Sequence, residues 1–154
     1  MSAQLAIAQQ APIANRFTKL DSSGNALPPD ATDHVMVHDA TTGLCWLVAY
    51  ASPKELNHKA AEKAAAKVDA GGHSDWRLPT RLELESILDL TKYNPAIDTS
   101  VFPGTKSDWH WSASPVAAYP GCAWLVSFNY GYVYNLRRDY HAWVRAVRGP
   151  RASQ

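Results

Sequence analysis

The chain has 154 residues, of which 46% are hydrophobic and 19% are charged. This length suits one domain whose core buries roughly 68–70% of the surface that the unfolded chain exposes. Fifteen lysines and arginines are balanced by fourteen aspartates and glutamates, which gives a formal net charge of +1. Such a balance provides no single-sign field for nucleic acid or an acidic membrane, so nucleic acid is not expected as a partner. The apolar content excludes a disordered chain.

The two ends of the sequence differ from its middle. Residues 1–14 are rich in Ala and Gln and contain Pro12, so we expect an N-terminal arm, either flexible or docked on another body. One domain is expected over residues 15–150, with a short tail over residues 151–154. The first residues carry neither a basic run nor a long apolar segment, so no signal peptide is expected. No run approaches the roughly 20 apolar residues that cross a bilayer, so membrane insertion is not expected.

The first part of the domain predicts three strands. Residues 16–20 alternate polar and apolar side chains, and a turn segment, Asp21-Ser22-Ser23-Gly24-Asn25, follows them. Residues 34–38 and 44–48 are two further strand candidates on either side of Asp39-Ala40-Thr41-Thr42-Gly43. We therefore expect a short strand followed by a β-hairpin.

Two helices are predicted in the middle of the chain, because two segments carry the signature of a helix start. Ser52-Pro53-Lys54-Glu55 places a capping serine three residues before a glutamate. Alanines then repeat at helical spacing up to Gly71-Gly72, which we expect to stop the helix. Thr80 and Glu83 form the same capping box at the second start. The apolar stripe of this second helix is Leu84, Ile87 and Leu88.

Beyond residue 100 the helical period disappears and strands are predicted. The candidates are residues 109–112, 123–128, 132–136 and 143–148. Trp124, Val126 and Phe128 alternate with other residues, which places three large apolar groups on one face. Tyr130-Gly131 suits a hairpin turn. Strands, two helices and more strands indicate an α+β fold, in which the N-terminal and C-terminal strands could meet in one antiparallel sheet.

Several segments of the sequence resemble a known domain, and two of them are specific. These are Asp75-Trp76-Arg77-Leu78-Pro79-Thr80 and the closing Val144-Arg145-Ala146-Val147-Arg148-Gly149, with Asp39, Thr42, Gly43, Leu44 and Trp46 before them. In this order they resemble the domain at the C-terminus of the Legionella collagen-like adhesin, the Lcl C-terminal domain family. The resemblance implies a C-type-lectin-like fold, related to that of the formylglycine-generating enzyme, with an antiparallel sheet, two helices and long loops. It also implies a ligand-binding module rather than an enzyme.

We interpret most residues of these motifs as structural. Trp46 and Trp76 are large apolar groups whose indole N–H needs a partner, which suits a core between helices and sheet. Arg77 and Arg145 suit buried guanidiniums that are satisfied by loop carbonyls or by aspartates, Asp39 and Asp75. The residues assigned a structural role are Asp39, Thr42, Gly43, Trp46, Asp75, Trp76, Arg77, Pro79, Trp124, Arg145 and Arg148.

The candidate ligand-binding residues lie in the last third of the chain, where aromatic and polar residues are concentrated. Tyr, Trp, Asn and Arg offer rigid contact area with polar tips, which suits stacking on a glycan or anchoring a protein. The predicted surface comprises Trp109, His110, Tyr119, Tyr130, Tyr132, Tyr134, Asn135, Arg137, Tyr140 and His141. The alternative for any one tyrosine is that it only covers the sheet, with its hydroxyl in water.

Residues that would support catalysis or metal binding are sparse. Cys45 and Cys122 are far apart in sequence and are expected to be reduced thiols, although a disulfide between them is geometrically possible. Asn94, Asp98 and Asp108 could supply oxygens to a calcium ion, but the Glu-Pro-Asn and Gln-Pro-Asp signatures of lectin-type calcium sites are absent. The histidines show no metal-ligand spacing. We therefore expect no cofactor and no metal.

The sequence thus predicts a non-catalytic, adhesin-like or receptor-binding module that recognises a host glycan or a host protein. The expected lack of a signal peptide and the family resemblance favour a phage or prophage product, located in the host cytoplasm or incorporated in a virion. Residues 1–14 would then attach it to a homo-oligomer or a virion assembly. Two alternatives stay open: an intracellular phage-encoded protein that inhibits or recruits a host protein, and, more remotely, an enzyme of the formylglycine-generating type.

Overall fold

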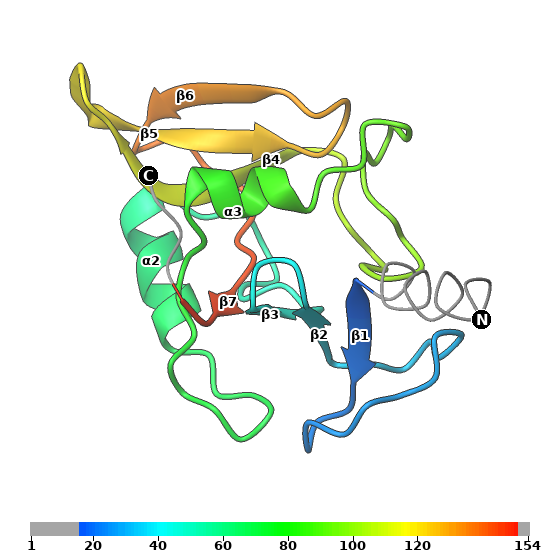
Figure 1. Ribbon diagram of the computed structural model, residues 1–154. Helices are drawn as coiled ribbons and strands as arrows, with labels where there is room; N and C mark the ends of the chain where they lie inside the picture. Colours follow the sequence, from blue (N-terminus) through cyan, green and yellow to red (C-terminus); the bar gives the residue numbers. More distant parts are fainter. Residues whose placement is uncertain (1–15, 151–154) are drawn as a thin grey trace, which may run out of the picture.

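Residues 16–150 are described by the computed structural model, and in this part of the chain two antiparallel sheets are combined with two helices (Figure 1). The predicted α+β class is confirmed. The expected N-terminal arm, residues 1–14, and the expected tail, residues 151–154, lie outside the described residues.

The first sheet joins the N-terminal strands to the end of the chain. In spatial order its strands are β1 (Phe17–Leu20), β2 (Met36–Asp39), β3 (Leu44–Leu47) and β7 (Val147–Arg148). The β2–β3 hairpin forms as predicted. Gly43 has a φ of +75°, and its N–H donates to the Asp39 carbonyl at 2.8 Å. The Asp39 carboxylate accepts from the Thr41 N–H and the Thr42 hydroxyl, which fixes the turn.

The second sheet contains the other C-terminal strands. In spatial order they are β4 (Trp109–Val116), β5 (Tyr119–Ser127) and β6 (Val133–Arg137). Trp111 lies opposite Leu125, which lies opposite Tyr134, so these three side chains point to one face. The expectation that N-terminal and C-terminal strands meet in one antiparallel sheet is therefore confirmed only for β7, because the other C-terminal strands form this second sheet.

The sheets separate because residues 142–146 cross between them, where the sequence predicts a long strand. The N–H of Trp111 in β4 donates to the Trp143 carbonyl, and the Trp143 N–H donates to the Trp109 carbonyl. Three residues later, the Ala146 carbonyl accepts from Leu47 of β3. Of the strand predicted at residues 143–148, only Val147–Arg148 remain as β7.

The first helix, α2 (His58–Ala66), starts later than predicted. Its N-cap is Asn57, whose side chain accepts the Ala60 N–H at 2.9 Å, whereas the Ser52 hydroxyl only closes a local turn. The cause is a tertiary contact: Leu56 exchanges two backbone hydrogen bonds with Ala142 and therefore stays extended.

The sequence signals are wrong for the end of the first helix and right for the start of the second. α2 is already capped by Lys67, so Gly71-Gly72 does not stop it and instead forms a turn farther along the chain. α3 (Arg81–Ser86) begins where predicted. The Thr80 hydroxyl accepts the Glu83 N–H, and the Glu83 carboxylate accepts the Thr80 N–H at 2.8 Å. This capping box is confirmed.

Buried side chains pack on both faces of the second sheet. Trp111 and Leu125 lie in one cluster with Ala61 and Ala65 of α2, whose small side chains let this helix approach closely. Val126 and Phe128 lie in the other cluster, with side chains of α3 and of the first sheet. The second sheet is therefore covered by helices on both sides, and β6 lies at its margin (Figure 1).

Candidate functional site

Exposed aromatic side chains gather on the second sheet and the loops beside it. Five tyrosines of the predicted surface are between 42% and 63% exposed: Tyr119, Tyr130, Tyr132, Tyr134 and Tyr140. A single exposed tyrosine is ordinary on a protein surface, so only rings that lie together indicate a binding area.

Three of these tyrosines meet other apolar side chains around the turn between β5 and β6. We call this group the hairpin-tip patch; it comprises Leu90, Tyr93, Trp109, Tyr130, Tyr132 and Tyr134. The Tyr93 and Tyr130 rings are nearly parallel, with centroids 6.3 Å apart, and Tyr132 meets Tyr130 edge-on at 5.9 Å. Trp109 and Tyr134 lie 6.4 Å apart. Tyrosine has only two side-chain torsions to fix, so ordering these rings on a ligand costs little entropy.

The loop after α3 contributes residues that sequence reasoning missed. The Asn94 N–H donates to the Asn129 carbonyl and the Ala96 N–H to the Phe128 carbonyl, each at 2.6 Å. These bonds hold the loop against the β5–β6 turn, where Figure 1 shows the two segments side by side. Tyr93 is thereby brought to its ring partner. In the sequence, Tyr93 follows the apolar stripe of the second predicted helix, and no local signal indicates which segment its ring contacts.

Gly131 sets how closely the turn approaches this loop. Its φ is +94°, a conformation that glycine adopts without steric cost. A Cβ at this position would lie 2.5 Å from Leu90 Cδ2. The turn therefore passes directly over Leu90, which is itself 73% exposed and forms the apolar rim of the hairpin-tip patch.

The other predicted ligand-binding residues lie away from this patch. Tyr119 is the first residue of β5. The nine residues of this strand span about 27 Å, so Tyr119 lies at the end of the β5–β6 hairpin opposite the patch. Tyr119 and Arg137 line a shallow concavity there. Tyr140 and His141 follow β6 and are exposed, and Asn135 lies half-buried in the middle of β6. The predicted surface therefore divides into two areas.

His110 is wrongly predicted as a ligand contact, because its side chain is completely buried. Its Nδ1 lies 2.8 Å from the Asp108 carbonyl, which can only accept, so the proton is on Nδ1. Nε2 then accepts from the Tyr50 hydroxyl at 2.7 Å. The Tyr50 oxygen accepts in turn from the Lys106 N–H and from Arg145. These contacts make His110 part of a closed internal network.

Burial lowers the pKa values of the two basic side chains in this network, His110 and Arg145. Burial and the neighbouring Arg145 guanidinium lower the pKa of His110 to about 3, so it is neutral near pH 7. Burial also lowers the pKa of Arg145. That guanidinium donates to the carbonyls of Leu47 and Val48 and to the Thr105 hydroxyl. The expectation that Arg145 is satisfied by loop carbonyls is therefore correct.

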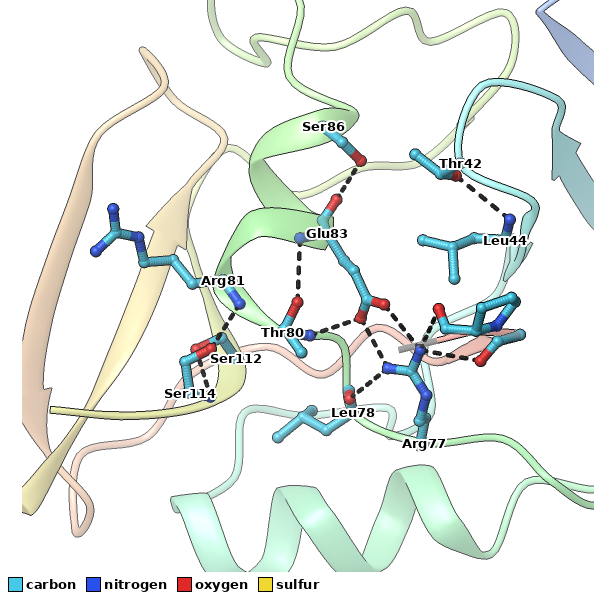
Figure 2. A network of polar contacts seen from close by, with 12 residues as sticks. Thr42, Leu44, Arg77, Leu78, Thr80, Arg81, Glu83, Ser86, Ser112 and Ser114 are labelled. Atoms are coloured by element: carbon cyan, nitrogen blue, oxygen red, sulfur yellow. Dashed lines mark hydrogen bonds and ion pairs between the residues drawn. The ribbon is translucent and has the colours of Figure 1, made fainter. Parts of the chain in front are cut away.

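The other arginine of the motifs belongs to a polar network beneath α3 (Figure 2). Both terminal nitrogens of Arg77 donate to the Glu83 carboxylate, at 2.7 and 2.8 Å. Arg77 also donates to the carbonyls of Gly149 and Pro150. Since Glu83 is buried and completes the Thr80 capping box, this pair joins the start of α3 to the end of the domain.

The two aspartates expected near the buried arginines pair with other arginines. Asp39 is 2.8 Å from Arg16, and Asp75 is 2.7 Å from Arg148. Burial alone would raise the pKa of Asp39, but the hydrogen bonds from Arg16, the Thr41 N–H and Thr42 together outweigh it and lower the pKa. Asp39 and Asp75 are therefore wrongly suggested as acidic partners of Arg77 and Arg145: the acid beside Arg77 is Glu83.

The two motif tryptophans, Trp46 and Trp76, differ in whether the indole N–H has a hydrogen-bond partner among the described residues. Trp76 is buried, and its indole N–H donates to the carbonyls of Ala70 and His73. Trp46 is fully buried, yet its N–H has no hydrogen-bond partner within residues 16–150. Its packing role therefore does not depend on a hydrogen bond there.

Two further motif residues support the packing of α3 on the second sheet. The Pro79 carbonyl accepts the Ala113 N–H of β4 at 2.7 Å. The Arg81 guanidinium lies 4.7 Å from the ring centroid of Trp124, which is half-buried in β5. Both contacts fix α3 against the sheet.

Thiols and potential metal ligands are scattered over the part of the chain that the structure describes. Cys45 and Cys122 are free thiols in different sheets, and burial raises the pKa of Cys45. Among residues 16–150, no three His, Cys, Asp or Glu side chains converge as metal ligands would. No helix in this part of the chain is long and apolar enough to span a membrane.

The chain matches a known protein family. The family model described as the Lcl C-terminal domain matches residues 35–148, which include β2 through β7. None of the curated proteins matches the chain.

Proposed function

Because the chain belongs to the Lcl C-terminal domain family, we propose that it is a non-catalytic, adhesin-like binding module. Its ligand contacts the hairpin-tip patch, and its source is a phage or prophage whose product recognises a host molecule. The observation that carries this proposal is the arrangement of the patch: the Tyr93, Tyr130 and Tyr132 rings contact one another in sequence, Trp109 lies beside Tyr134, and Leu90 lies beneath the β5–β6 turn.

The chemistry of the patch favours binding. Tyr93, Tyr130, Tyr132 and Tyr134 are each more than half exposed, so a large apolar area stays in water in the free protein. Covering such area is favourable by roughly 25 cal/mol per Å². Tyrosines are enriched where a few residues supply most of the binding energy. Both a glycan, through stacking, and a protein, through anchoring rings, suit these side chains.

The test is a pull-down from host envelope and lysate fractions with the purified full chain and with a Y130A/Y132A/Y134A variant. We expect the chain to retain a specific component that the triple variant loses by tenfold or more, at about 1.4 kcal/mol per factor of ten. The melting temperature of the variant should change by only a few degrees, because these rings are largely in water.

The matched control is a Y119A/Y140A variant, which removes two exposed tyrosines outside the hairpin-tip patch. We expect it to bind like the natural chain. Equal capture by the triple variant and by the natural chain contradicts the proposal, and so does loss of capture only in the control. Collapse of the fold in the triple variant would show that these tyrosines belong to the core.

A further inference from the structure

We propose that the outer edge of β6 binds an extended polypeptide segment of the ligand as an added β-strand. This inference rests on the proposed function, since it concerns the ligand of the adjoining hairpin-tip patch, and it selects a protein or peptide over a glycan. It is carried by the hydrogen-bonding pattern of the sheets and by what covers each of their edges.

The direction of the β6 backbone follows from its ladder with β5. The Ser127 N–H donates to the Tyr132 carbonyl, and the Arg138 N–H donates to the Gly121 carbonyl. In an antiparallel pair such bonded residues alternate with residues whose N–H and C=O point away. Val133 and Asn135 therefore direct their backbone groups away from β5.

The edges of the first sheet are covered by other segments of the chain. Leu27 returns beside β1, and its N–H donates to the Lys19 carbonyl at 2.8 Å. At the opposite edge, Arg77 and Val147 of β7 exchange both backbone hydrogen bonds, at 2.8 and 2.9 Å. Neither edge is fully open to an added strand.

The β4 edge of the second sheet is covered too. Trp143 lies along it and bonds to both Trp109 and Trp111. Farther along, the Ala113 N–H donates to the Pro79 carbonyl, and Pro115 adds an irregularity in the pairing. Proteins protect sheet edges in such ways because an open edge is a template for another chain.

β6 lacks this protection. Within residues 16–150, no strand or bridge pairs with its outer side, and Figure 1 shows it as the outermost strand of its sheet. Its sequence, Val-Tyr-Asn-Leu-Arg, contains no proline and no lysine, the residues that commonly block an edge. Its one charged residue, Arg137, stands at the end.

The chemistry of this edge specifies its occupant. Val133 and Asn135 present one donor and one acceptor each, repeating at about 6.8 Å, the two-residue repeat of an extended chain. An added strand would place alternate side chains beside Tyr132 and Tyr134 on one face, and beside Asn135 and Arg137 on the other. The segment should therefore alternate aromatic or β-branched residues with polar ones.

The test uses a displayed library of eight-residue peptides selected on the purified full chain. An Asn135→Pro variant removes an outward N–H without removing a bond to β5, and an Asn135→Ala variant deletes only the side chain. We expect selected peptides to show the alternating pattern. They should bind the alanine variant as they bind the natural chain, and the proline variant about tenfold more weakly.

Amide hydrogen exchange provides a readout that needs no variant. In the free chain the Val133 and Asn135 amides should exchange faster than the Tyr134 and Leu136 amides, which are bonded to β5. The bound peptide should slow the first pair. Protection of that pair in the free chain overturns the proposal. Protection that depends on protein concentration would assign the edge to a second copy, and protection that does not would assign it to another part of this chain.

The remaining outcomes separate this inference from the proposed function. Failure to select any peptide, or equal binding to both Asn135 variants, overturns the strand-edge proposal. If the triple tyrosine variant loses its host ligand while the proline variant keeps it, the binding module stands and only this inference falls. If the tyrosine variant keeps the ligand as well, the proposed function itself fails.

Discussion

At the scale of single residues, burial of His110 couples the fold to pH. Burial and Arg145 lower its pKa to about 3, from an ordinary value of 6.5. Between these values the unfolded chain binds a proton that the folded chain does not. This contribution to stability is therefore complete above pH 6.5 and is lost as the pH falls toward 3, by up to about 1.4 kcal/mol per pH unit.

We expect the free energy of unfolding, measured in urea, to fall as the pH is lowered from 6.5 to about 4. His58, whose pKa is also lowered by burial, acts in the same direction. A His110→Gln variant isolates the contribution of His110 and should show a shallower decrease than the natural chain. The same pH dependence in both proteins would mean that His110 does not change its protonation on unfolding.

At the scale of elements, the turn between β5 and β6 determines the shape of the hairpin-tip patch. A Gly131→Ala substitution forces a left-handed backbone on alanine, which costs about 1–2 kcal/mol. Its new Cβ also displaces the exposed Leu90 side chain, which can move at little cost. We therefore expect a modest loss of stability together with weaker ligand binding, measured by denaturation and by the pull-down.

Gly24 supplies the matched control for this substitution. Its φ is +84°, and a Cβ there would meet nothing within 4 Å. Gly24→Ala should lose about as much stability as Gly131→Ala while binding normally. Normal binding by both variants would show that the position of Leu90 does not matter to the ligand.

The elements themselves were predictable to the extent that their signals are local. Thr80 and Glu83 lie three residues apart and satisfy one another, so the start of α3 follows from the sequence. Ser52 carries the same signal, but Leu56 is held extended by Ala142 from the far end of the chain. A hydrogen bond between such distant residues leaves no local mark in the sequence.

At the scale of the whole molecule, the sequence predicts which types of residue form the candidate site better than it predicts where these residues lie in the fold. Tyr130, Tyr132 and Tyr134 were identified because aromatic residues cluster in one sequence segment. Tyr93 was missed because only the fold brings its loop to the β5–β6 turn, and Tyr119 was grouped with them although β5 separates it from the patch. His110 was misplaced because its side chain is enclosed by Tyr50 and Phe128.

The most direct test of the account is where the ligand covers the molecule. Amide hydrogen exchange of the full chain would be compared with and without the host component that the pull-down retains. We predict slower exchange in residues 88–95 and 128–135, which carry the hairpin-tip patch and the open part of β6, and no change in residues 117–122 at the opposite end of the hairpin. Protection confined to residues 117–122 and 138–141 would place the binding surface elsewhere and contradict the account.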